Sequence, residues 1–185
     1  EISEQFPENL YAVFVAVGGG GLIAGIGAYL NKVNPNVKII GVEAADSAGL
    51  HASISAGKRV KLKEVGLFAD GAAAKQIGKN NYELIKNFLD DSITVDTDEI
   101  CAAVKDTFLE TRTVPEPTGA LALAGLKKYI SQKRIKNKNL IATYCGSNLN
   151  FESLGHIVER SKIGEKKEII LSIAIDEKKG SFRKL

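Results

Sequence analysis

Several residue types that mark particular protein classes are scarce in this chain of 185 residues. It has only two cysteines, Cys101 and Cys145, so a framework of several disulfide bonds is excluded. Its two histidines, His51 and His156, stand in no metal-binding spacing with those cysteines. Zinc sites need closely spaced cysteine or histidine pairs, and we therefore expect no metal site.

The chain also lacks a strong excess of charge of either sign. Its 25 basic and 22 acidic residues leave a net charge of +3, and most of the excess lies in residues 127–138, around the end of an expected helix. Basic side chains are common there because they complement the carbonyl end of a helix, so we expect no nucleic-acid partner. The apolar runs near Val13 and Leu121 are too short to span a membrane, and the acidic start is unlike a signal peptide. We therefore expect a cytoplasmic protein with no membrane partner.

Glycine, in contrast, is plentiful, and four of the 18 glycines are consecutive. The apolar, β-branched run 13–17 ends at Gly18, Gly19, Gly20 and Gly21. A run of small residues with helical spacing begins at Leu22, so the order is a strand, a tight turn and a helix N-terminus. The first N–H groups of a helix have no internal partner and lie at its positive end, and glycine lets the backbone approach an anion closely. The pattern predicts a phosphate site at residues 18–22, with a turn that binds no ligand as the alternative.

Runs with strand character alternate with runs of helical spacing along most of the chain. We expect strands over 11–17, 37–42, 92–95 and 140–144. We expect helices over 22–33, 47–56, 81–89, 98–111 (capped by Thr97) and from Thr118 onward. Strands separated by helices predict an α/β fold, a mostly parallel twisted sheet with helices on both faces.

Ligands of such sheets bind at the carboxyl ends of the strands, so we expect residues 18–21, 43–47 and 145–148 to form one pocket. Residues 19–24 also fit the dinucleotide pattern Gly-x-Gly-x-x-Gly/Ala, and Glu43 stands where that fold places the acid that binds ribose. Four consecutive glycines satisfy this pattern in several registers. From the residues alone, a nicotinamide dinucleotide and another phosphate-bearing cofactor are equally compatible with the turn.

The composition changes near the C-terminus. We interpret the charged run 162–168 as a linker that follows a domain over residues 1–161. Beyond it, residues 169–175 alternate apolar side chains and lead into a polar, glycine-containing turn. This pattern predicts a strand and a turn whose partner strands are not in this chain.

Five stretches resemble, in order and spacing, the biosynthetic threonine dehydratases, a branch of the tryptophan-synthase-like (fold-type-II) pyridoxal-phosphate enzymes. They are Gly-Gly-Gly-Gly-Leu at 18–22, Val-Glu-Ala at 42–44, Val-Gly-Leu-Phe-Ala-Asp-Gly at 65–71, Glu-Pro-Thr-Gly-Ala-Leu-Ala at 116–122 and Cys-Gly-Ser-Asn at 145–148. The third stretch is specific to this branch, and the similarity covers almost the whole chain. Residues 169–185 resemble the start of the family's ACT-like regulatory domain.

The resemblance implies pyridoxal 5'-phosphate as the cofactor. The residues implied to bind it are Gly18, Gly19, Gly20, Gly21, Leu22, Gly71, Glu116, Cys145 and Ser147. The first five would hold the phosphate, Gly71 would lie near the phenolic oxygen of the ring, and Glu116 would lie farther out. Cys145 stands where the family usually has a serine whose hydroxyl meets the pyridine nitrogen, and Ser147 is the substitute. The alternatives are an Asp70-Gly71 capping turn, a surface Glu116 and an ordinary buried thiol at Cys145.

The resemblance also implies a lyase of isoleucine biosynthesis that converts L-threonine to 2-oxobutanoate and ammonia, with L-serine as a second possible substrate. Such an enzyme would be a homo-oligomer with isoleucine as its allosteric effector. The family's cofactor-carrying lysine lies in a Ser-x-Lys-x-Arg-Gly-Ala motif, which this chain lacks. We therefore expect the C-terminal part of the catalytic region and the start of the regulatory one, inactive alone and without a catalytic residue. The alternatives are a phosphate- or nucleotide-binding module and a non-catalytic subunit that acts by association.

Overall fold

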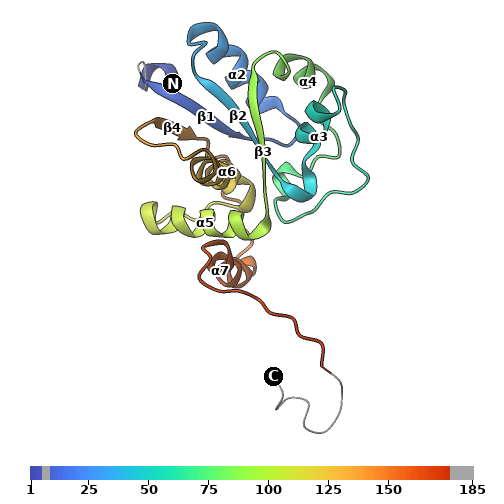
Figure 1. Ribbon diagram of the computed structural model, residues 1–185, viewed down its shortest axis with the longest axis vertical. Coiled ribbons are helices and arrows are strands. Elements are labelled where there is room, and N and C mark those ends of the chain that lie inside the picture. Colours follow the sequence, from blue (N-terminus) through green and yellow to red (C-terminus); the bar gives the residue numbers. More distant parts are fainter. Residues whose placement is uncertain (6–8, 176–185) are drawn as a thin grey trace.

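The computed structural model describes residues 1–5 and 9–175, and its centre is one parallel sheet (Figure 1). The strands are β1 (Leu10–Ala16), β2 (Lys38–Ala44), β3 (Leu89–Val95) and β4 (Asn139–Ala142), in the order β3-β2-β1-β4. All three pairings are parallel, which confirms the predicted α/β fold.

Helices cover both faces of this sheet, and each face has its own apolar core. On one face lie α2 (Gly21–Val33), α3 (Gly49–Ser55) and α4 (Lys79–Ile85), and on the other lie α5 (Thr97–Thr111) and α6 (Pro117–Lys133). Successive side chains of a strand point to opposite faces. In β1, therefore, Phe14 packs in the core beneath α5 and α6, while Val13 and Val15 pack in the core beneath α2 and α4.

The remaining elements are short or peripheral. The chain opens with α1 (Ile2–Gln5), and the 3-10 turns η1 (Ala45–Ser47) and η2 (Asp70–Ala72) lie within the connections. Near the C-terminus α7 (Ser153–Gly164), which the sequence patterns did not predict, packs against α5. An ion pair between Arg160 and Asp98, 2.6 Å apart, links these two helices. Of the helices within 1–5 and 9–175, none is long and apolar enough to cross a membrane.

The boundary between α4 and β3 differs from the prediction of a helix over 81–89 and a strand over 92–95. The helix ends at Ile85, and the strand already begins at Leu89. Leu89 pairs with Ile39 of β2, and the carboxylate of Asp90 accepts the Ile39 N–H at 2.8 Å. These partners come from a distant part of the chain, so tertiary pairing overrides the helical spacing of residues 86–89.

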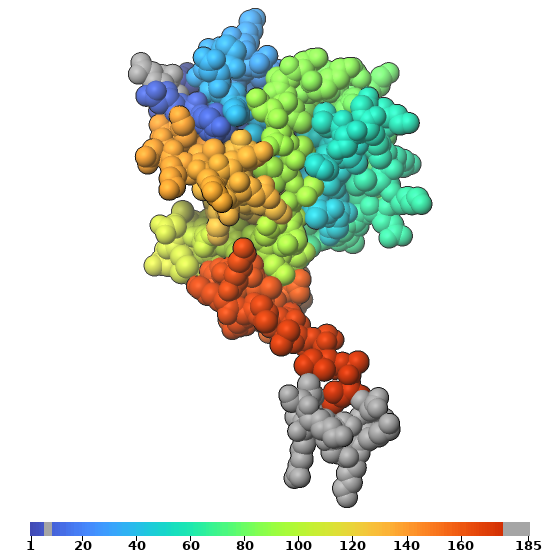
Figure 2. All heavy atoms as spheres, viewed as in Figure 1, coloured from blue at the N-terminus to red at the C-terminus, as the bar shows by residue number. Residues whose placement is uncertain are grey.

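One prediction for the C-terminal segment is wrong within the described residues, and the other, a strand whose partners lie outside this chain, stays a prediction. Residues 162–164 belong to α7 and not to a linker, and residues 169–175 form no strand. Figure 2 shows this segment extending away from the body of the protein, with Ile169 and Leu171 more than 70% exposed. A strand needs a neighbour that completes its hydrogen bonds, and none of the described residues pairs with 169–175. The predicted turn lies in residues 176–185, outside the described residues, and their assignment to a regulatory domain stays a prediction.

Candidate functional site

The glycine turn joins the end of β1 to the first residue of α2. Gly20 caps the helix with a φ of +85°, and a Cβ on it would lie 2.9 Å from the Ile77 side chain. A Cβ on Gly18 would lie 2.9 Å from the Ala72 Cα. These two glycines are therefore required by the fold itself, because a larger residue would be strained or would collide with its neighbours.

Gly19 and Gly21 face open space. A Cβ on either would meet nothing within 4 Å, and neither has a positive φ. The Gly19 carbonyl is held by the Gly78 N–H at 3.1 Å and by Nδ2 of Asn81 at 2.8 Å. In contrast, the N–H groups of residues 19–22 donate to no acceptor in the part of the chain that the structure describes. The Gly19 carbonyl thus fixes the turn, while the N–H groups of residues 19–22 remain available to an anion.

A cavity of about 300 Å³ opens beside this turn, at the carboxyl end of β1. It is lined by Ala16, Gly18, Gly19, Gly20, Gly21, Leu22, Gly71, Ala72, Glu116, Thr118 and Cys145. Eight of the nine residues implied by the resemblance are therefore brought together, although they come from four separate segments. Ser147 is not among them: it lines a neighbouring cavity of about 360 Å³ that also includes Thr107 and Tyr144.

Two loops bring the opposite wall of this cavity to the glycine turn. The Gly71 N–H donates to the Asp70 carboxylate at 2.8 Å within η2, whose N-cap residue is Ala69, so Asp70 does not cap this turn, and Gly71 lines the cavity. Glu116 is half-buried at the N-terminus of α6, and its N–H donates to the Gly146 carbonyl at 3.2 Å. Because this bond joins the start of α6 to the segment after β4, it fixes the position of Cys145 in the wall.

Cys145 presents an uncharged thiol to the cavity. Burial raises the pKa of the thiol, and the nearby carboxylate of Glu116 raises it further. A neutral thiol is a weak hydrogen-bond donor and acceptor, so this position offers a ring nitrogen a poorer partner than the serine usual in the family. Cys101, the other cysteine, is buried on α5 with its pKa raised to about 12, and it does not line this cavity.

Thr118 is a cavity residue that the sequence reasoning missed. Its hydroxyl is buried and has no hydrogen-bond partner in the described part of the chain. The residue stood inside the quoted stretch 116–122, but nothing in the sequence distinguished it from its neighbours. Only the tertiary structure shows that Thr118 lines the same cavity as the glycine turn, with its hydroxyl oxygen buried.

Glu43 and the segment 43–47 do not join this cavity, contrary to the expectation of one pocket from three segments. The Glu43 side chain is buried, and its two carboxylate oxygens accept the N–H groups of Leu50 and His51, each at 2.7 Å. Burial raises its pKa to about 7 despite these hydrogen bonds. With both oxygens occupied at the start of α3, Glu43 is unavailable to a ribose, which removes the main support for the dinucleotide alternative.

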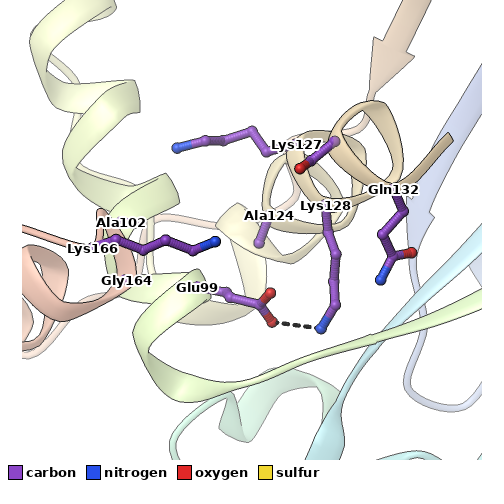
Figure 3. A pocket seen from close by; sticks show the side chains of 9 residues that line it. Glu99, Ala102, Ala124, Lys127, Lys128, Gln132, Gly164 and Lys166 are labelled. Atoms are coloured by element: carbon purple, nitrogen blue, oxygen red, sulfur yellow. Dashed lines mark hydrogen bonds and ion pairs between the residues drawn. The ribbon is translucent and has the colours of Figure 1, made fainter. Parts of the chain in front are cut away.

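Figure 3 shows a different cavity, of about 290 Å³, between α5, α6 and the end of α7. Lys128 and Glu99 form an ion pair there at 2.9 Å, and Lys127 pairs with Asp106. Lys166 points into the cavity and has no ion pair within the described residues. Two of the three ammonium groups are thus already compensated, and we assign this cavity no ligand. The described residues also contain no group of three or more metal-ligating side chains.

Comparisons with known proteins identify the family of this chain. The family described as pyridoxal-phosphate dependent enzyme matches residues 1–146. The chain is 48% identical over 184 residues to the biosynthetic L-threonine dehydratase of Burkholderia multivorans, covering 100% of this chain and 36% of that protein. It is 49% identical to the mitochondrial threonine dehydratase of Schizosaccharomyces pombe, covering 96% of this chain and 30% of that protein.

A solved structure gives the same result for the fold. The processed form of threonine deaminase isoform 2 from Solanum lycopersicum superposes with a TM-score of 0.86 at 39% identity, covering 88% of this chain and 44% of that chain. The present chain thus spans about a third of the length of the two curated relatives.

Proposed function

The chain belongs to the family of pyridoxal-phosphate dependent enzymes, and we propose that it forms the phosphate-binding side of the cofactor site of an L-threonine ammonia-lyase. The observation that carries the proposal is the cavity of about 300 Å³, in which the free N–H groups of the glycine turn face Gly71, Glu116 and Cys145. The longer enzyme would convert L-threonine to 2-oxobutanoate and ammonia.

The residues present fit this cofactor. The unpartnered N–H groups at the start of α2 suit a phosphate dianion, and the space in front of Gly19 and Gly21 is what a phosphate would need. The neutral thiol of Cys145 lies farther along the cavity and offers a weak hydrogen-bonding group. When bound, pyridoxal phosphate supplies the electron sink that lets an amino acid lose its α-proton and its β-hydroxyl group.

The chain's own residues then bind and orient rather than transfer protons. In this proposal the turn at residues 18–21 anchors the phosphate, and Cys145 leaves the ring nitrogen uncharged because a thiol with a raised pKa does not ionise near neutral pH. No Ser-x-Lys-x-Arg-Gly-Ala motif occurs in the 185 residues. We therefore propose that the chain alone binds the cofactor without turning over threonine. Two relatives that are about half identical to this chain are named threonine dehydratases, and this supports a lyase rather than a non-catalytic subunit.

A titration tests the binding part of this proposal. Pyridoxal phosphate, added to the purified chain and followed by fluorescence, is expected to bind saturably, inorganic phosphate is expected to compete with it, and NAD is expected not to bind. After borohydride reduction and proteolysis, mass spectrometry is expected to find no lysine modified in stoichiometric amount. Binding of NAD without binding of pyridoxal phosphate would contradict the proposal.

The activity part needs the longer protein that contains the lysine motif. It is expected to release 2-oxobutanoate from L-threonine, whereas the 185-residue chain is not. L-Serine, tested in parallel, would show how far the site discriminates between the two hydroxy amino acids. A longer protein that binds the cofactor but releases no 2-oxo acid from either substrate would refute the assignment as a lyase.

We also propose that the longer enzyme is a cytoplasmic homo-oligomer with isoleucine as its effector. Light scattering on the purified longer protein measures its oligomeric state, and activity assays with and without isoleucine measure its response to the effector. A monomer whose activity is unchanged by isoleucine would contradict both parts of this proposal. Cell fractionation tests the location.

A further inference from the structure

The peptide units of the glycine turn are fixed by two different parts of the protein. The Gly20 carbonyl accepts the Ala24 N–H at 3.0 Å, so helix α2 itself fixes the unit that carries the Gly21 N–H. The unit between Gly19 and Gly20 lies outside the helix. Its orientation is therefore set by contacts from elsewhere in the chain.

The start of helix α4 supplies those contacts. The Gly19 carbonyl accepts the Gly78 N–H at 3.1 Å and Nδ2 of Asn81 at 2.8 Å, and no other donor within the described residues reaches it. Asn81 lies in the first turn of α4, which is anchored in the core by the buried side chains of Tyr82 and Ile85. The Asn81 amide therefore reaches the turn from a fixed position, although it is 62 residues away from Gly19 in the sequence.

Gly78 leaves room for both donors. A Cβ on Gly78 would lie 2.9 Å from Asn81 Nδ2 and 3.3 Å from the Gly19 carbonyl oxygen. A larger residue at this position would push the amide away from the carbonyl. With glycine there, both donors share the Gly19 oxygen, which has a lone pair for each.

The direction of the Gly20 N–H follows from the direction of the Gly19 carbonyl. In a trans peptide unit these two groups point in opposite directions. The carbonyl is directed at α4, so the Gly20 N–H points away from α4, and Gly20 lines the cavity of about 300 Å³ whereas Gly78 and Asn81 do not. Because this unit has glycine on both sides, it can flip at little steric cost. A flip would turn the N–H toward α4 and the carbonyl oxygen away from it.

We propose that Asn81 is a positioning residue, which holds the peptide unit between Gly19 and Gly20 so that the Gly20 N–H donates to the phosphate group of the cofactor. This inference rests on the proposed function. A phosphate oxygen accepts from an N–H group and repels a carbonyl oxygen. A flipped unit would therefore weaken binding by losing a donor and by adding a repulsive contact. Asn81 raises the affinity without touching the phosphate, because it stabilises the orientation that binds.

Asn81→Ala removes the amide, and Asn80→Ala is the matched control. Asn80 lies one position earlier in the same helical turn, and its exposed side chain makes no bond to the Gly19 carbonyl. In calorimetric titrations, Asn81→Ala is expected to raise the dissociation constants for inorganic phosphate and for pyridoxal phosphate by roughly three- to tenfold, the effect of one lost hydrogen bond. Asn80→Ala is expected to bind both ligands like the unchanged chain. Thermal melts identify a temperature at which every variant is folded, and the titrations are made below it.

NMR of the isotope-labelled chain distinguishes one misoriented N–H group from a general loss of structure. At saturating inorganic phosphate, the amide signals of Gly20, Gly21 and Leu22 are expected to shift in the unchanged chain, because each N–H gains an acceptor. In Asn81→Ala the shift of Gly20 is expected to shrink, whereas the shifts of Gly21 and Leu22 are expected to remain, since α2 fixes their peptide units.

Equal affinities of Asn81→Ala and Asn80→Ala would overturn this inference and leave the proposed function intact. An equal loss of the shift at Gly20, Gly21 and Leu22 would overturn it as well, because the whole turn would then be disturbed and not one peptide unit. Failure of the unchanged chain to bind either inorganic phosphate or pyridoxal phosphate would overturn both proposals.

Discussion

Replacing Gly19 or Gly21 by alanine should separate folding from cofactor binding within a single turn. An added Cβ at either position meets nothing within 4 Å, and neither residue has a positive φ, so the folded chain accommodates the methyl group without strain. Alanine also restricts the unfolded chain, which raises the free energy of unfolding by roughly 0.5 kcal/mol. For a chain of this size the unfolding temperature should then rise by about 1–2 °C.

The same methyl group occupies the space that a phosphate needs in front of the free N–H groups. Losing one or two charge-assisted hydrogen bonds, at about 1.5–3 kcal/mol each, weakens binding of pyridoxal phosphate by roughly 10- to 100-fold or more. Isothermal titration calorimetry with pyridoxal phosphate measures this loss, and a thermal melt of the same samples measures stability. Gly155→Ala, in the exposed face of α7 with the same open surroundings, controls for the substitution itself.

Gly18→Ala and Gly20→Ala should behave in the opposite way. The Gly18 Cβ would lie 2.9 Å from backbone of Ala72, and Gly20 has a left-handed φ of +85°, so each variant should lose about 1–3 kcal/mol of stability. The reasoning would be refuted if Gly19→Ala and Gly21→Ala bound pyridoxal phosphate like the unchanged chain. It would equally be refuted if all four variants lost the same stability.

Three further predictions concern the body of the fold. Between about pH 4.5 and 7 the folded chain keeps a proton on Glu43 that the unfolded chain has lost, so stability should fall by about 3 kcal/mol as the pH rises through this window. Urea titrations at pH 5 and pH 8 should show that fall in the unchanged chain and a flatter profile in Glu43→Gln; parallel profiles would contradict the raised pKa. Asp96→Ala removes the capping box in which Asp96 and Glu99 bond each other's N–H groups at 2.8 and 2.9 Å, and should cost about 1 kcal/mol in urea unfolding. Glu110→Ala on the exposed end of the same helix should cost almost nothing, and equal losses would argue against the box. Gly27→Ala places a Cβ 2.0 Å from the Phe88 ring and should destabilise the chain by about 1–3 kcal/mol, a loss that Phe88→Leu should partly restore. Gly25→Ala, with open surroundings on the same helix, should instead melt no lower than the unchanged chain.

The local parts of the fold and site could be predicted because local residue chemistry specifies them. An apolar run followed by glycines and a small-residue helix sets β1, the turn and α2 within one or two residues, since strand pleat, turn geometry and helix spacing act over a few positions. The family's motifs likewise indicated eight residues that the structure gathers around one cavity. Thr97 was predicted to cap α5, yet Asp96 does so, because a carboxylate one position earlier reaches the Glu99 N–H.

Other features depended on partners that no local pattern reveals. The alternation in residues 169–175 has the period of a strand, but a strand forms only where a neighbour accepts its hydrogen bonds, and no neighbour within 1–5 and 9–175 pairs with that segment. Helix α7 escaped prediction since its apolar positions are sparse, and its packing against α5 stabilises it.

The sequence by itself therefore determined the glycine turn and the order of strands and helices, because these follow from residue types at short range. The resemblance of five stretches to a known family, and not the pattern of the turn, indicated the cofactor class. The tertiary structure alone decided which side chains share a cavity. It turned Glu43 toward the backbone of α3, moved Ser147 to a neighbouring cavity, and left the hydroxyl of Thr118 unpaired beside the turn. The physical reason is that burial and hydrogen-bond partners are set by segments distant in sequence, which meet only when the sheet and its helices have packed.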